Sequence, residues 1–68
     1  MQDYQQRVID EKTELDAKLE RLTTFITGSS IYAALPEVEK DCLSRQHTAM
    51  TQYSGILAER IAGFPTKA

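Results

Sequence analysis

The sequence predicts an all-α fold: an antiparallel two-helix hairpin that assembles into a symmetric helical homo-oligomer. Two long stretches repeat their apolar side chains in alternating steps of three and four residues, the pattern of helices that pack against helices. A break at residues 28–35 separates the two stretches. The 68 residues form a single domain, 1–68, and a chain this short buries only about 60% of its unfolded surface. Copies of the same chain are therefore expected to complete its core.

The first helix is expected at about residues 3–27. Asp3 could cap its start, because a carboxylate accepts the free N–H groups of the first turn. Lys12 interrupts the apolar seam, and a polar residue at such a position can fix the register of two helices. Gly28 lies just beyond the seam and predicts a left-handed helix end. The seam comprises Val8, Lys12, Leu15, Leu19, Leu22 and Ile26.

The segment 28–35 is the expected turn. Ser29 or Ser30 could cap a short helical turn, because either hydroxyl can accept the N–H groups of the residues that follow. Pro36 suits the first position of the next helix, where no backbone N–H is needed. A connection this short makes the two long helices antiparallel neighbours.

The second helix is expected at about residues 36–62. Gly63 and Pro65 end it, and residues 66–68 form a short tail. A third heptad row makes its apolar stripe wider than one partner helix requires, which predicts burial against other copies. The two expected inner rows are Leu43, Met50, Leu57 and Phe64, and, three residues later, Gln46, Tyr53 and Arg60. The third row is Cys42, Ala49 and Ile56.

Charge and composition exclude several classes of partner. Eight basic and ten acidic residues are interspersed and give a net charge of −2, so a long nucleic acid is not expected as a partner. No apolar run approaches the roughly 20 residues of a membrane helix, and the N-terminus lacks the apolar core of a signal peptide. The expected location is the cytoplasm, with no membrane partner.

Metal, cofactor and catalytic chemistry are not expected either. The single cysteine, Cys42, and the single histidine, His47, cannot supply the usual ligand set of a structural zinc site, and no disulfide can form within one chain. Cys42 is expected to be a buried, reduced thiol. His47 is interpreted as a partly buried or surface residue, because no phosphate-binding loop or nucleophile motif accompanies it. The sequence thus predicts a protein that is not an enzyme.

Aromatic and basic side chains are the candidates for binding a ligand. Tyr4 and Lys18 share a heptad row but lie about 21 Å apart along the helix, so they cannot bind one small ligand within a single chain. Across a symmetric interface they could. The simpler interpretation is that Tyr4 covers a helix end and that Lys18 pairs with Glu14. Arg60 is either an anion contact repeated by symmetry, or a side chain that snorkels to solvent or pairs with a Glu of a neighbouring chain.

Short motifs spread over about residues 3–64 carry a resemblance to a known family. They are Tyr4–Lys12, Leu15–Leu19, Leu22–Ile26 and Leu35–Glu39, with Gln46, Met50, Tyr53, Ile56-Leu57 and Arg60-Ile61. On these motifs the chain resembles the phage-encoded anti-CBASS proteins, which act as cyclic-oligonucleotide sponges. The resemblance implies a protein that sequesters cyclic di- and trinucleotide immune messengers without cleaving them, in the cytoplasm of the infected bacterial host.

The resemblance also implies an assembly and a set of binding residues. Family members form a hexamer from two trimers, with dinucleotides held between protomers and trinucleotides around the threefold axis. It implies Tyr4 with Lys18 or Arg21 at the dinucleotide pocket, and Arg60 with Thr23 or Thr24 at the trinucleotide site. The chain begins close to Tyr4, so the short extra N-terminal helix seen in the family is expected to be shortened or absent. The candidate ligand-binding residues are Tyr4, Arg7, Lys18, Arg21, Thr23, Thr24 and Arg60.

A function of another class is also consistent with the pattern. An apolar stripe of this width could belong to a structural or adaptor coiled coil that binds another protein. Cyclic nucleotides would stabilise a sponge against heat and would leave an adaptor unchanged.

Overall fold

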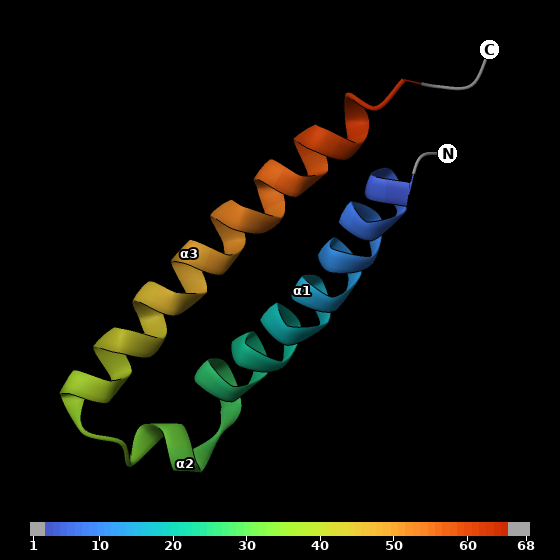
Figure 1. The fold of residues 1–68 in the computed structure, drawn as a ribbon. Helices are drawn as coiled ribbons and strands as arrows, with labels where there is room; N and C mark the ends of the chain where they lie inside the picture. Colours follow the sequence, from blue (N-terminus) through green and yellow to red (C-terminus); the bar gives the residue numbers. More distant parts are fainter. Residues whose placement is uncertain (1–2, 66–68) are drawn as a thin grey trace.

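The computed structural model describes residues 3–65, and the predicted tail at 66–68 lies outside them. The order of elements is α1 (Asp3–Gly28), α2 (Ser30–Ala33) and α3 (Glu37–Ala62). Within residues 3–65 no strand occurs, which confirms the all-α prediction. Figure 1 shows that α1 and α3 lie side by side and run in opposite directions, with α2 at the turn between them.

The seam predicted for α1 is confirmed by its burial. Val8 and Leu15 are buried, and the other four members of the seam are half-buried. Gln5 continues the same spacing toward the N-terminus and is also buried. Asp3 is the first residue of α1, so its carboxylate lies in the first turn of the helix.

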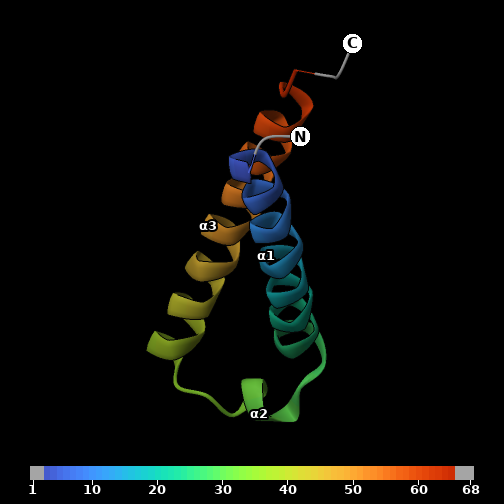
Figure 2. The same cartoon turned by 45° about the vertical axis from the view of Figure 1, so that its right-hand side comes forward.

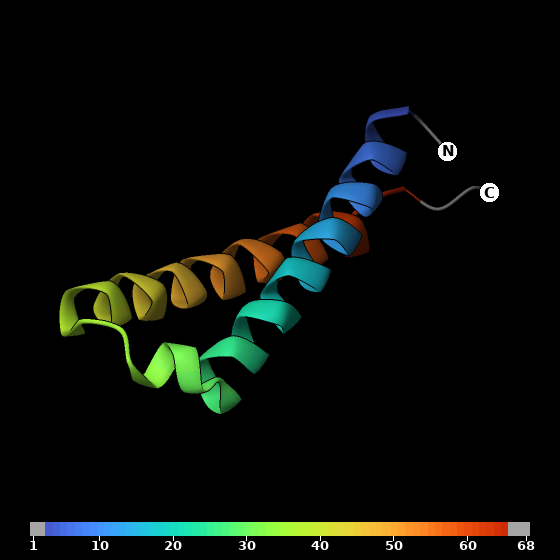
Figure 3. The same ribbon diagram turned by 90° about the horizontal axis from the view of Figure 1, so that it is seen from below.

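The core lies in the half of the molecule that contains the two termini. Val8, Leu15 and Leu57 are the buried apolar side chains among residues 3–65, and Leu57 has no exposed surface. Met50, Ile61 and Phe64 pack against this cluster and are partly buried. Figures 2 and 3 show that α1 and α3 diverge from this end toward α2. The two helices therefore share a small core at one end and separate at the other.

The row of α3 that faces α1 differs from the expected one. Leu43, Met50, Leu57 and Phe64 do face α1, but the row beside them is His47, Ser54 and Ile61, four residues after each of the first three. The predicted inner positions of Gln46, Tyr53 and Arg60 are wrong, since all three are exposed. The periodicity misled because His47 and Ser54 are polar and are held at the helix contact by hydrogen bonds.

A polar cluster links α1 to α3 in the middle of their contact. The Lys12 ammonium donates to the Asp16 carboxylate at 2.6 Å and to the Ser54 hydroxyl at 3.2 Å. Ser54 donates in turn to the other carboxylate oxygen of Asp16 at 2.5 Å. The hydrogen bonds from Lys12 and Ser54 lower the pKa of Asp16. The interruption of the seam at Lys12 is thus a specific contact, consistent with its predicted role in register.

The turn follows the prediction in part. The Ser29 hydroxyl accepts from the backbone N–H groups of Ile31 at 3.1 Å and Tyr32 at 3.4 Å, so Ser29 is the cap of α2. The left-handed helix end predicted at Gly28 is wrong: no glycine in residues 3–65 has a positive φ, and Gly28 is the last residue of α1. Pro36 is the N-cap of α3 and precedes its first helical residue.

Aromatic contacts close the turn end of the helical pair, and a glycine ends α3 at the other. At the turn, the rings of Phe25 and Tyr32 meet edge to face at 5.8 Å, and the Lys40 ammonium lies 5.7 Å from the Tyr32 ring. At the other end α3 stops at Ala62, with Gly63 as its C-cap, as predicted.

Within residues 3–65, neither long helix contains a stretch apolar enough to cross a lipid bilayer.

Candidate ligand-binding site

All seven candidate binding residues lie on the surface of the single chain. Six of them belong to α1, and Arg60 lies in the last turn of α3. Each is exposed in the absence of a neighbouring chain. They are therefore available to a ligand or to a second copy, and none is required to form the core of one protomer.

Tyr4 is held in place by the end of α3. Its ring meets the Phe64 ring edge to face at 5.7 Å, and 49% of the residue remains exposed. The expectation that Tyr4 covers a helix end is confirmed by this contact. Half of the residue is still open to stacking on another flat group.

The basic candidates differ from the other basic residues in their partners. Lys12, Lys40 and Arg45 pair with Asp16, Glu37 and Asp41 respectively. None of the ion pairs formed among residues 3–65 includes Arg7, Lys18, Arg21 or Arg60. The expected pair of Lys18 with Glu14 is thus not formed. Four exposed cations remain without a carboxylate within the described part of the chain, and all four are among the candidate binding residues.

The Thr23 side chain is part of a contact between α1 and α3. Its hydroxyl donates to the Leu19 carbonyl at 2.9 Å and lies 2.9 Å from Nε2 of His47. The hydroxyl has one hydrogen, so Thr23 cannot donate to the Leu19 carbonyl and to His47 Nε2 at the same time, and the tautomer of His47 decides which group donates in this contact. Thr24, the adjacent candidate, is exposed.

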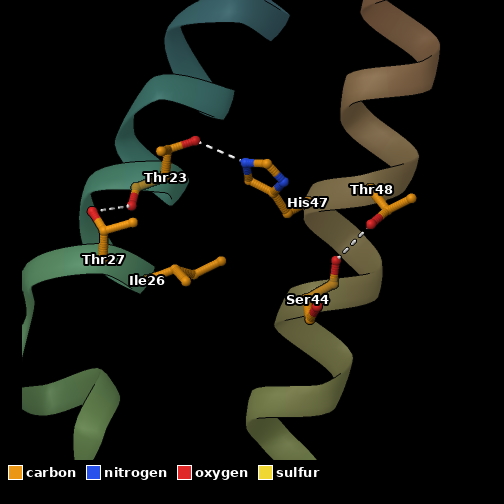
Figure 4. Close-up of a pocket in the computed structure, with 6 residues that line it drawn as sticks. All are labelled: Thr23, Ile26, Thr27, Ser44, His47 and Thr48. Carbon is orange, nitrogen blue, oxygen red and sulfur yellow. Dashed lines mark hydrogen bonds between the residues drawn. The ribbon is translucent and has the colours of Figure 1, made fainter.

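A shallow cavity of about 220 Å³ surrounds this contact where the two helices diverge (Figure 4). It is smaller than the roughly 300–1,000 Å³ typical of pockets for drug-sized ligands, so it is too small for a whole cyclic dinucleotide. Its lining comprises Thr23, Ile26, Thr27, Ser44, His47 and Thr48. Of these six residues, only Thr23 was predicted from the sequence to lie in a binding site. The signal that could have identified His47 is its place four residues after Leu43, on the face that packs against α1.

The structure does not bring the candidate residues together within one chain. Tyr4 and Lys18 lie on one face of α1 but are separated by about 21 Å. Thr23 and Thr24 lie in the half of α1 that leads to α2, whereas Arg60 lies at the opposite end of a molecule 53 Å long. A compact site built from these residues therefore needs contributions from more than one copy.

Comparison with known proteins agrees with the resemblance seen in the motifs. The sequence profile of the Sequestin family matches residues 2–63, which is nearly the whole chain. Neither the comparison with curated proteins nor the comparison with solved structures found a match. The match spans both long helices and the turn between them, so it includes every candidate binding residue. The chain therefore belongs to the Sequestin family.

Proposed function

We propose that this chain binds cyclic di- and trinucleotide immune messengers in the cytoplasm of an infected bacterium and sequesters them without cleavage. Removing the messenger from solution would block CBASS-type antiphage signalling. The observation that carries the proposal is the set of four exposed cations without carboxylate partners, together with an exposed tyrosine, on a Sequestin-family chain.

The chemistry of these side chains suits a cyclic oligonucleotide. A base has a flat π-face that stacks on a tyrosine ring, a contact worth about 1–3 kcal/mol per base. Each phosphate carries a negative charge, and Arg or Lys forms charge-assisted hydrogen bonds to it. Tyr4 with Lys18 or Arg21 accordingly serves the dinucleotide, with Arg7 nearby on α1, and Arg60 with Thr23 or Thr24 serves the trinucleotide.

Self-assembly is part of the proposal, and we propose a homohexamer. A helical hairpin with three buried apolar side chains among residues 3–65 has a small core, and chains of this size commonly gain stability from oligomerisation. Tyr53 and Ile56 remain 42% and 55% exposed on α3. In a symmetric assembly, Lys18 of one copy can reach Tyr4 of another. Arg60 residues repeated around a threefold axis match the three phosphates of a cyclic trinucleotide in number and charge.

We also propose that the protein has no catalytic activity toward the messenger. Binding and release are then reversible, and the ligand leaves unchanged. Inhibition of signalling by a sponge depends on stoichiometry, so the protein must be present at a concentration comparable with that of the messenger.

The test is a thermal-shift panel of cyclic di- and trinucleotides on the purified protein. At a ligand concentration one hundred times Kd, the stabilisation is about 2.7 kcal/mol, which raises the melting temperature of a domain of this size by roughly 10–20 °C. A linear dinucleotide of the same bases is the control. If no cyclic nucleotide raises the melting temperature, the adaptor function becomes the better account; if the nucleotide is recovered in linear form, the protein is an enzyme.

A further inference from the structure

We infer that α3 pairs antiparallel with α3 of a second copy, through a row of residues that the single chain leaves exposed. The inference rests on the self-assembly proposed above and adds the surface and the orientation. We call this surface the outer row. It comprises Glu39, Cys42, Gln46, Ala49, Tyr53, Ile56 and Arg60, all exposed, in alternating steps of three and four.

The outer row has the spacing of a second helix-packing seam. The inner face of α3 has the same alternation and is covered by α1, as the burial of Leu57 shows. The outer row lies about 100° around the helix from that face, and two of its large side chains, Tyr53 and Ile56, are about half exposed. A helix with two such seams is expected to have a helical neighbour on each.

Charge decides the direction of the second helix. The outer row carries Glu39 near its N-terminal end and Arg60 near its C-terminal end. Two parallel rows would place carboxylate beside carboxylate and guanidinium beside guanidinium. Two antiparallel rows bring Arg60 of one copy within one helical turn of Glu39 of the other, which is attractive at both ends.

Side-chain size and register agree with the antiparallel direction. When Cys42 of one copy lies opposite Arg60 of the other, Ala49 lies opposite Tyr53. The small Ala49 side chain leaves room for the Tyr53 ring of the other copy, and the twofold axis repeats this contact, so each large side chain packs against a small one. Arg60 stays at the edge of the seam in this arrangement, where an anion can still reach it.

A flanking row provides an independent charge match. Arg45, Gln52 and Glu59 recur every seven residues on the side of the outer row away from α1, and all three are exposed. In the same antiparallel register, Arg45 of each copy lies within two residues of Glu59 of the other, about 3 Å along the axis, and the two Gln52 residues lie equally close to each other near the twofold axis. In the single chain, Arg45 Nε lies 3.0 Å from a carboxylate oxygen of Asp41, and both side chains are about 70% exposed. A contact about a twofold axis is one of the two kinds of interface that join two trimers into a hexamer.

The test exchanges the charges of the flanking row. Arg45→Glu or Glu59→Arg alone turns two attractive contacts into repulsive ones, and we expect self-association to weaken about tenfold at low salt. The double variant R45E/E59R, and an equimolar mixture of the two single variants, both restore opposite charges and should return to wild-type association. Sedimentation velocity measures the assembly, and circular dichroism checks that each variant keeps its helix content. If self-association weakens in the single variants and is restored in neither the double variant nor the mixture, the pairing of Arg45 with Glu59 of the other copy is wrong. The pairing is equally wrong if the single variants associate as strongly as the wild type.

A cross-linking experiment tests the direction separately. In the antiparallel register, the two Cys42 residues lie about 27 Å apart along the axis, too far for a disulfide. Gln52→Cys on a Cys42→Ser background should instead give a covalent dimer with a short bismaleimide. A rapid disulfide-linked dimer of the wild-type protein through Cys42 would show parallel pairing and refute the inference. Thermal shifts with a cyclic dinucleotide on the same samples test the proposed function separately from the proposed interface. If the nucleotide stabilises the protein but the charge exchange gives no rescue, the proposed function stands and the antiparallel pairing of α3 is wrong.

Discussion

Replacing Tyr4 with alanine tests the dinucleotide site directly. The substitution removes the ring of a residue that is 49% exposed, so the affinity for a cyclic dinucleotide should fall by about 1–3 kcal/mol. That range corresponds to a Kd roughly 5 to 150 times weaker. Isothermal titration calorimetry of the wild-type and variant proteins with the same dinucleotide measures the difference.

The same substitution also removes a structural contact, so it needs a matched control. The edge-to-face contact between Tyr4 and Phe64, 5.7 Å between ring centroids, is worth about 0.5–1.5 kcal/mol of stability beyond its buried area. Phe64→Leu loses that contact and leaves Tyr4 in place, and Tyr4→Phe keeps the ring and loses only the hydroxyl. We expect Tyr4→Phe to bind nearly as the wild type does, and Phe64→Leu to lower the melting temperature with little change in Kd.

Two results would refute this reasoning. Wild-type affinity in Tyr4→Ala, with the assembly intact by sedimentation, would remove Tyr4 from the binding site. A loss of affinity in Phe64→Leu as large as that in Tyr4→Ala would show that Tyr4 acts through packing at the end of α3, and stacking on a base would then be wrong.

The other predictions concern the second site, the assembly, the core and pH. Arg60→Ala should weaken trinucleotide binding by at least about 1.5–3 kcal/mol and leave dinucleotide binding nearly unchanged, as calorimetry with both ligands would show. Ile56→Glu should dissociate the oligomer in sedimentation experiments, because it places a charge in an apolar contact; an intact oligomer would exclude Ile56 from the interface. Leu57→Ala should cost about 2–5 kcal/mol in chemical denaturation, because Leu57 is fully buried; a loss below 1 kcal/mol would contradict the position of the core. Hydrogen bonds from Lys12 and Ser54 lower the pKa of Asp16 below its ordinary value of 3.8. The ionised Asp16 therefore stabilises the fold fully at pH values above 3.8, and this stabilisation is lost as the pH falls through the lowered pKa. Asp16→Asn should remove that part of the acid dependence in melting curves recorded below pH 4, and an unchanged acid dependence would show that Asp16 does not contribute.

The periodicity of the sequence predicted α1 well and α3 only in part. Every seam position of α1 proved to be buried or half-buried, because most of them are apolar and the spacing is regular. In α3 half of the inner face is formed by His47, Ser54 and Ile61, and two of these are polar. Their partners on α1, Thr23 and Asp16, are 24 and 38 residues away in sequence, so no local pattern reveals them.

Exposure and burial within one chain account for the remaining differences. Cys42 was expected to be buried and is exposed in the single chain, where its sulfur lies 3.4 Å from a guanidinium nitrogen of Arg45. Its row is apolar in sequence because, in our proposal, another copy covers it. The candidate binding residues could be chosen from their chemistry and from the family resemblance. Their arrangement around a ligand could not, because it depends on contacts between chains and not on the periodicity of one helix.

The central claim is that the protein holds a cyclic nucleotide and returns it intact. Equilibrium dialysis of the purified oligomer against a cyclic dinucleotide, followed by heat denaturation and chromatography of the released ligand, measures both parts in one sample. We predict saturable binding at a fixed ratio of ligand to protomer and full recovery of the unmodified cyclic dinucleotide. Failure to retain any cyclic di- or trinucleotide, or recovery of linear products absent from a protein-free control, would contradict the account.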